Sequence, residues 1–393
     1  MLIKGFKFSA VEAAIKKPGR KDLAMIFSEV PAVCAATFTS NKVKAAPVLL
    51  GQERVATGVL RAVVVNSGNA NACTGEPGME AARETARLVA QAVGVPEAEV
   101  VPSSTGVIGV QMPMDRLRSA VPALVAGLTE GTLDDVALAI MTTDTFPKIS
   151  SRQGVAGGKP YTIAGVAKGA GMIRPDMATM LAFIVTDAAV DPTFLQDSAR
   201  SCVASSFNCI TVDNDMSTND TALFMANGMA GNAPISGASA DAGLFEQLLG
   251  EVTLELAKAI VKDGEGATKF VTINVSGAAN DAEARIAAMA VANSPLVKTA
   301  FFGQDANWGR ILAAVGYSGA QVDQSKVSLF FDEVQMVCGG LFIGGDAEKL
   351  GSEVLKKPEF SVNIGLSLGS GCSTVYTSDF SYDYVKINAD YRT

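Results

Sequence analysis

The chain has 393 residues, 48% of them hydrophobic, and its 40 acidic and 32 basic side chains give a net charge of −8. This length and hydrophobic content suffice for buried cores in about two or three domains, and the acidic balance argues against a nucleic-acid-binding surface. The sequence contains no histidine, which excludes Ser-His-Asp and Cys-His catalysis and every His-ligated zinc site. Any general base must therefore be a carboxylate, a lysine, a tyrosine or an amino terminus.

Two further sequence patterns bear on the cellular location of the protein and on metal binding. No run approaches the roughly 18 apolar residues of a membrane-spanning helix, and the charged N-terminal segment lacks the apolar core of a signal peptide. Six cysteines are scattered without CxxC pairing, so we interpret them as small buried hydrophobes rather than disulfide partners or metal ligands. We therefore expect a cytoplasmic protein with no bound metal.

Strand and helix patterns alternate along the chain. Strands are predicted, in chain order, at 61–68, 99–106, 161–169, 180–188, 221–228 and 269–277. Helices are predicted at 77–94, 114–128, 133–142, 192–206, 244–262 and 281–293, followed by the segment 307–317 and several strands. This alternation is typical of a mixed α/β (α/β or α+β) fold. The only soft boundary, near Gly277–Asp281, suggests domains at 1–280 and 281–393.

One acidic segment resembles a calcium loop without completing it. DNDMSTND (213–220) begins with Asp213 and Asp215 at suitable spacing. Thr218 stands where such a loop requires glycine, and Phe224 stands where it requires glutamate. We therefore expect no calcium site there.

The segment 168–188, KGAGMIRPDMATMLAFIVTDA, carries the most informative chemistry. Its Gly- and Pro-containing turn delivers Ala178 and Thr179 to the start of an apolar strand. Cleavage between these two residues would give Thr179 a free α-amine, whose pKa of about 7.7–8.0 suits a general base. One residue would then supply both nucleophile and base. Considered alone, an Ala-Thr pair favours the plainer interpretation of an ordinary strand threonine.

Seven motifs, in order along the chain, favour the catalytic interpretation of Thr179 instead. They are NSGNANACTG (66–75), SSTGVIG (103–109), TTDTFPK (142–148), the segment 168–188, DGEGATK (263–269), GQDANWGRI (303–311) and INADYRT (387–393). Together they resemble the ornithine acetyltransferase family, the glutamate N-acetyltransferases of arginine biosynthesis, over essentially the whole chain. In that family a precursor cleaves itself at an Ala-Thr bond. The resemblance therefore implies cleavage between Ala178 and Thr179, with Thr179 as the nucleophile.

The resemblance also implies roles for other residues. Thr105 and Gly106 would form the oxyanion hole through a hydroxyl and a backbone N–H, although Ser-Thr-Gly alone is more typical of a simple turn. Thr142 and Lys168 match substrate-binding positions, and an ammonium suits the carboxylate of an amino acid.

Three further positions lie in the C-terminal part of the chain. Glu265 is similar to a family residue near the nucleophile and would hold the α-ammonium of Thr179 or of ornithine. Asn388 and Thr393 match substrate-contacting positions. Their assignment rests wholly on the resemblance, because a chain end of this kind is more often frayed.

The implied fold is an α-β-β-α layered sandwich with a smaller C-terminal α/β domain. The implied reaction transfers acetyl from N-acetylornithine to glutamate through acetyl-Thr179. Fragments 1–178 and 179–393 would stay associated, as a heterotetramer. No cofactor is implied, and acetyl-CoA is left open as a second acetyl donor. Two alternatives stay open at this point: a self-cleaving threonine aminopeptidase or amidase of the same broad fold, and a non-catalytic small-molecule binding protein with an uncut chain.

Overall fold

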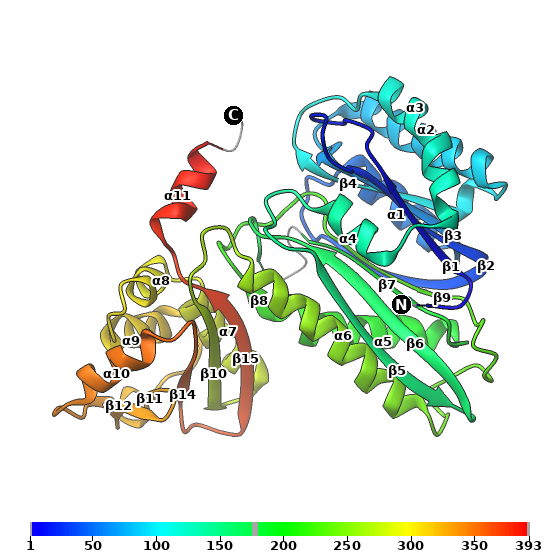
Figure 1. Cartoon of the computed structure of the whole chain (residues 1–393). Coiled ribbons are helices and arrows are strands. Elements are labelled where there is room, and N and C mark those ends of the chain that lie inside the picture. Colours follow the sequence, from blue (N-terminus) through cyan, green and yellow to red (C-terminus); the bar gives the residue numbers. More distant parts are fainter. Residues whose placement is uncertain (1, 175–179, 391–393) are drawn as a thin grey trace. The chain divides into compact units, whose positions relative to one another are not determined.

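The computed structural model describes residues 2–174 and 180–390, which form two compact units (Figure 1). Unit 1 comprises Met1–Asn208 and Asp215–Ile260, and unit 2 comprises Cys209–Asn214 and Val261–Thr393. The main division thus lies at 260/261, whereas the sequence pattern suggested 280/281. Each unit has its own sheet.

The sheet of unit 1 has eight strands. In chain order they are β1 Phe6–Val11, β2 Leu23–Phe38, β3 Val59–Asn69, β4 Val100–Val107, β5 Lys148–Ala156, β6 Lys159–Lys168, β7 Leu181–Thr186 and β9 Thr221–Ala226. Their spatial order is β4-β3-β2-β9-β7-β6-β5, with β1 paired antiparallel to β2. The order shows that β9 and β7, which follow the predicted cleavage bond in sequence, lie between β2 and β6, which precede it.

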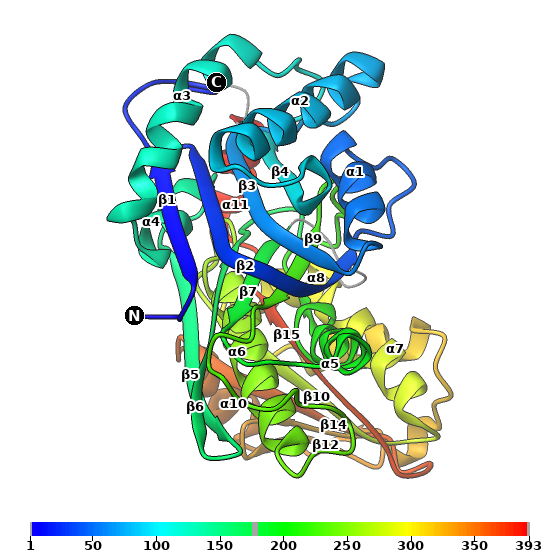
Figure 2. The ribbon, with the colours of Figure 1, turned by 90° about the vertical axis from the view of Figure 1, so that its right-hand side faces the viewer.

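The helices of unit 1 cover both sides of this sheet. They are α1 Ala46–Val55, α2 Gly75–Val93, α3 Met114–Ala126, α4 Leu133–Ile140, α5 Pro192–Ser205 and α6 Ala242–Lys262, the last of which extends across the unit boundary. Helices α2 and α3 pack on one face of β2, β3 and β4 (Figure 2). The opposite face of these strands meets β6, β7 and β9 across a second core, to which α4 also contributes.

Beyond that second core, α5 and α6 form the outermost layer. Phe245 of α6 contacts the rings of Tyr161 and Phe194. The two halves of the one sheet form the two inner layers, so the order is helices, half-sheet, half-sheet, helices, and the predicted α-β-β-α arrangement is confirmed within unit 1. The long strand β2 shifts register between Phe27 and Ala32 and serves both halves of the sheet.

Unit 2 is a smaller α/β unit with a seven-stranded sheet. Its strands are β8 Ile210–Thr211, β10 Phe270–Ala278, β11 Ser328–Phe331, β12 Val334–Cys338, β13 Leu341–Phe342, β14 Glu359–Gly365 and β15 Gly371–Ser378, in the spatial order β13-β12-β11-β14-β10-β15-β8. Its helices are α7 Asp281–Ala292, α8 Pro295–Phe302, α9 Trp308–Tyr317, α10 Ala347–Leu355 and α11 Tyr382–Ala389. One apolar core joins this sheet to α7, α8, α9 and α10.

Local sequence explains these elements. In β3, Ala62, Val63, Val64 and Val65 are all buried, as expected of a strand covered on both faces. Helix α4 begins with a capping box, in which Thr132 and Asp135 exchange hydrogen bonds with each other's backbone N–H groups. The mixed α/β class is confirmed. Within the described ranges, no helix has the length and apolar character needed to cross a membrane.

Three of the six cysteines, however, are exposed. Cys34, Cys202 and Cys209 are buried, whereas Cys73, Cys338 and Cys372 are exposed. The expectation that cysteines serve as buried hydrophobes is therefore wrong for half of them.

Candidate active site

Thr105 and Gly106 lie near the end of β4, beside the end of the parallel strand β3. Gly106 has φ +136°, and a Cβ added there would lie 2.3 Å from the carbonyl carbon of Gly68. The backbones of the two strand ends therefore meet at a distance that excludes any side chain. Glycine at position 106 is a geometric requirement of this contact.

Lys168 brings two predicted threonines together. It ends β6 and is 3% exposed, and its Nζ donates to Thr142 Oγ1 at 2.7 Å and to Thr105 Oγ1 at 3.4 Å. Because an ammonium only donates, both hydroxyl oxygens act as acceptors here, and their own hydrogens remain available to a further acceptor. One ammonium and two hydroxyls thus make a polar centre suited to a carboxylate or a developing oxyanion.

Asp144 completes this centre, although the sequence analysis did not single it out. Its carboxylate accepts hydrogen bonds from Thr142 N–H at 2.9 Å and Gly169 N–H at 2.8 Å. It also pairs with Lys148 Nζ at 2.7 Å and lies 3.9 Å from Lys168 Nζ. Burial raises the pKa of Asp144, but the neighbouring Lys168 and Lys148 ammonium groups outweigh burial and hold that pKa below its ordinary value. Asp144 is therefore ionised.

Asp220 is a second buried carboxyl group that the sequence analysis missed. It is fully buried directly before β9, and its Oδ1 accepts from the Met180 N–H at 2.8 Å. Met180 is the first described residue after the predicted cleavage bond. Burial raises the pKa of Asp220 well above its ordinary value, despite the Met180 hydrogen bond and the Lys168 charge. Burial therefore favours the protonated form of Asp220, in contrast to Asp144.

Glu265 and Asn388 form a separate pair in unit 2. Glu265 is 8% exposed, and its Oε2 accepts from Asn388 Nδ2 at 2.9 Å. Ser381 Oγ donates to the Gly266 carbonyl and also accepts from the Asp383 N–H, which caps α11. The C-terminal helix that carries Asn388 is thus hydrogen-bonded to the segment that carries Glu265.

Three predicted residues lie outside the described residues: Ala178, Thr179 and Thr393. The roles assigned to them stay predictions. Among the described residues, the structure brings Thr105, Thr142 and Lys168 together and pairs Glu265 with Asn388, and the roles predicted for these residues stay predictions as well. Asp144 lies within TTDTFPK and Asp220 within DNDMSTND, but neither motif marks its aspartate as part of the site.

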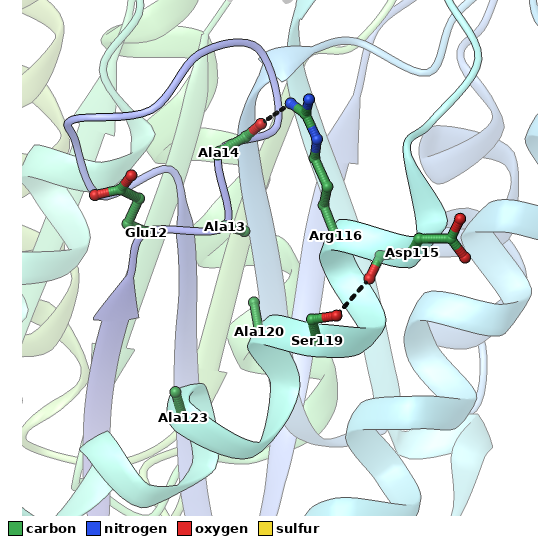
Figure 3. A pocket seen from close by; sticks show the side chains of 8 residues that line it. All are labelled: Glu12, Ala13, Ala14, Asp115, Arg116, Ser119, Ala120 and Ala123. Carbon is green, nitrogen blue, oxygen red and sulfur yellow. Dashed lines mark hydrogen bonds between the residues drawn. The ribbon is translucent and has the colours of Figure 1, made fainter.

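A surface pocket of about 470 Å³ lies elsewhere in unit 1, between the segment after β1 and helix α3 (Figure 3). Four alanines line it with Glu12, Asp115, Arg116 and Ser119. Arg116 donates to the Ala14 carbonyl, so its guanidinium is already engaged. None of the predicted site residues that the structure describes contributes to this pocket. Within the described parts of the chain, no three metal-binding side chains of the His, Cys, Asp or Glu type lie close enough to hold an ion.

Comparison with known proteins connects this arrangement to one family. The model of the ArgJ family matches residues 7–393. A Geobacter sulfurreducens protein named arginine biosynthesis bifunctional protein ArgJ is 67% identical over 393 residues, which cover 100% of both chains. A Syntrophotalea carbinolica protein of the same name is 56% identical over 100% of this chain and 99% of the relative.

A solved structure also matches. The crystal structure of arginine biosynthesis bifunctional protein argJ from Bacillus halodurans aligns with a TM-score of 0.51 at 39% identity. The alignment covers 53% of this chain and 97% of the solved chain.

The opposite pKa shifts of the two aspartates predict different effects of pH on stability. In the unfolded chain Asp220 ionises near its ordinary pKa of about 3.9, whereas in the native state burial raises its pKa. Its contribution to stability is therefore fully present below about pH 4 and falls as pH rises towards the native pKa. The free energy of unfolding of the wild type, minus that of Asp220→Asn, should fall between pH 4 and 7, by at most about 1.4 kcal/mol per pH unit.

Urea unfolding at four pH values measures this difference. Asp144→Asn is the matched control, because Asp144 is ionised in both states above pH 5 and its difference should be constant from pH 5 to 7. A constant difference for Asp220→Asn as well would mean that Asp220 is ionised in the native state.

The Gly106 contact predicts a second effect. Gly106→Ala places a Cβ against the Gly68 carbonyl at φ +136° and should lower the free energy of unfolding by about 3 kcal/mol or more. Gly58→Ala is the control, since Gly58 has φ +80° with no atom near its added Cβ and should cost only about 1–2 kcal/mol. Equal losses in chemical denaturation would show that backbone strain alone, and not the close contact, decides the cost.

Proposed function

The chain belongs to the ArgJ family, and from this premise we propose that it is a glutamate N-acetyltransferase of arginine biosynthesis. It moves an acetyl group from N-acetylornithine to glutamate. The observation that carries the proposal is the buried centre in which Lys168 joins Thr105 and Thr142. The relatives that align with the whole chain are named as bifunctional proteins of arginine biosynthesis, which favours transfer over the amidase alternative.

The first step is self-cleavage. The Thr179 hydroxyl attacks the carbonyl carbon of Ala178, the C–N bond breaks, and the hydroxyl proton passes to the nitrogen, which becomes the α-amine of Thr179. Water then hydrolyses the resulting ester, which leaves 1–178 and 179–393 as two separate polypeptides of one assembly. The matched Bacillus halodurans chain supports this step, because 53% of this chain covers 97% of it, a share close to the 215 of 393 residues in 179–393.

Acetyl transfer follows the same chemistry. The Thr179 hydroxyl attacks the acetamide carbon of N-acetylornithine while its α-amine takes the proton. The Thr105 hydroxyl and the Gly106 N–H hold the tetrahedral oxyanion. The C–N bond then breaks, and ornithine leaves with the proton. The glutamate amine attacks the carbonyl carbon of the acetyl ester, the bond to the Thr179 oxygen breaks, and a proton from the glutamate amine passes through the α-amine to that oxygen. The Thr105 hydroxyl suits this role because its oxygen accepts from Lys168 while its hydrogen points elsewhere.

The remaining residues recognise the substrates. Lys168 and Thr142 bind the α-carboxylate that ornithine and glutamate share. Glu265, paired with Asn388, binds an ammonium group, and Thr393 contacts substrate at the chain end. The word bifunctional in the relatives' names supports a second activity, for which we propose acetyl-CoA as donor. The fragments assemble as a heterotetramer in the cytoplasm.

Self-cleavage predicts two polypeptides in the purified protein. Denaturing electrophoresis should resolve two bands, and N-terminal sequencing of the larger should begin at Thr179. Thr179→Ala should give one uncut chain without activity, because both the hydroxyl and the liberated amine disappear, whereas Thr179→Ser keeps a hydroxyl and should still cleave. A single intact band from active wild-type protein would rule out this mechanism.

Use of one site by donor and acceptor in turn predicts ping-pong kinetics. Double-reciprocal plots at several fixed glutamate concentrations should be parallel. Mass spectrometry after mixing with N-acetylornithine alone should find about 42 Da added to the fragment that begins at Thr179, the mass of an acetyl group replacing a proton. The same addition with acetyl-CoA alone would support the second donor.

Thr179→Ala, which lacks the nucleophile, is the control for labelling. Intersecting lines without a labelled fragment would indicate direct transfer in a ternary complex.

A further inference from the structure

Two consecutive residues, Asn219 and Asp220, hold both sides of the candidate site. Asn219 Nδ2 donates to the Ser104 carbonyl at 2.9 Å and to the Ala70 carbonyl at 2.6 Å. Ser104 directly precedes the predicted oxyanion donor Thr105. On the other side, Asp220 accepts from the N–H of Met180, which directly follows the predicted nucleophile. The end of β4 and the segment directly before β7 are therefore both hydrogen-bonded to the dipeptide Asn219-Asp220.

The chain at Met180 is fixed through both of its backbone polar groups. Its N–H donates to Asp220 Oδ1 at 2.8 Å, and its carbonyl accepts from the Thr221 N–H at 3.1 Å. The Asp220 carbonyl in turn accepts from the Thr39 N–H at 3.0 Å, directly after β2. Asn219 and Asp220 are 7% and 0% exposed, so solvent does not compete for these hydrogen bonds.

The Asp220 carboxyl group carries a feature that packing alone does not explain. Among the described residues, no partner reaches its buried Oδ2 in hydrogen-bond geometry. Burial raises the pKa of Asp220 well above its ordinary value and outweighs the Lys168 charge and the Thr39 side chain, which both lower that pKa. A buried polar atom left without a partner costs stability, and such costs are typical of functional sites.

We propose that Asn219 and Asp220 are positioning residues that set the spacing between Thr105 and the chain at Met180, and thereby the rate of self-cleavage. Neither residue needs to exchange a proton with the reacting atoms. Their effect acts through Ser104 and Met180, because a displacement of about 1 Å can slow a reaction about 100-fold. The inference rests on the self-cleavage proposed above.

The test compares variants of the full chain made by cell-free synthesis, with cleavage followed over time by denaturing electrophoresis. Asp220→Ala and Asn219→Ala should each slow cleavage by about tenfold or more. Asp220→Asn keeps a neutral Oδ1 acceptor and should cleave within about threefold of the wild type, since the Met180 hydrogen bond survives.

Asp187→Ala is the matched control for a general loss of stability. Asp187 is 2% exposed at the far end of β7 and accepts backbone N–H groups from Thr162 at 2.7 Å and Lys4 at 3.2 Å. Its removal should lower Tm without slowing cleavage at temperatures where the protein stays folded. Equal slowing in Asp187→Ala and Asp220→Ala would overturn the proposal. Wild-type cleavage in Asp220→Ala, or cleavage in Asp220→Asn as slow as in Asp220→Ala, would also overturn it.

A second measurement does not depend on cleavage. With ¹⁵N-methionine labelling, the Met180 amide should be protected from hydrogen exchange in the wild type and in Asp187→Ala, and should lose protection in Asp220→Ala. An uncut wild-type chain would refute self-cleavage, and the exchange rates would still decide whether Asp220 holds Met180. Retained protection in folded Asp220→Ala would overturn the positioning role by itself.

Discussion

The burial of the Lys168 ammonium is the constraint on which the candidate site depends. A buried charge is stable only when an opposite charge and hydrogen-bond partners surround it. Asp144 supplies the charge, and Thr105 and Thr142 supply hydroxyl oxygens. Because these partners come from β4 and from the segment after α4, the ammonium is accommodated only when three separate parts of the chain have reached their native positions. The same hydrogen bonds orient the two hydroxyls. The interaction that permits burial of the ammonium therefore also positions the Thr105 and Thr142 hydroxyls as hydrogen-bond donors.

Two aspartates of the site show that the environment of a carboxyl group, and not the residue type alone, sets its pKa. Asp144 lies against two ammonium groups and two backbone N–H groups and is ionised. Asp220 accepts one backbone N–H, and its complete burial raises its pKa well above the ordinary value. A chain without histidine thus contains, within the same unit, two carboxyl groups whose pKa values are shifted in opposite directions. The Asp144 carboxylate balances the lysines, and the Asp220 carboxyl group accepts the Met180 N–H.

The sequence predicted much of this structure, but not all of it. Uninterrupted apolar runs such as Ala62–Val65 and capped, periodic helices such as α4 were predicted because their signals are local. Strand β2 was missed because Glu29 and Pro31 interrupt its pattern at the point where its register shifts. At the site, family motifs pointed to Thr105, Thr142 and Lys168, which the structure joins by hydrogen bonds. Asp220 could not be predicted, because its importance arises from burial and from contacts with residues 40 and more positions away. The pairing of Thr105 with Lys168 joins residues 63 positions apart, and spacing along the chain does not encode it.

The interleaved order of the unit 1 sheet has a consequence for assembly. Strands β9 and β7 lie between β2 and β6, so a cut between residues 178 and 179 leaves strands of one polypeptide inserted between strands of the other. Before the cut, folding is a unimolecular event whose equilibrium is independent of dilution. After it, unfolding releases two molecules, and their recombination becomes second order in protein concentration. Each separated fragment would also expose strand edges in the middle of the former sheet, where unpaired N–H and carbonyl groups favour aggregation. The native state of a cut molecule thus forms in the uncut precursor. At high dilution, unfolding of the cut molecule is effectively irreversible.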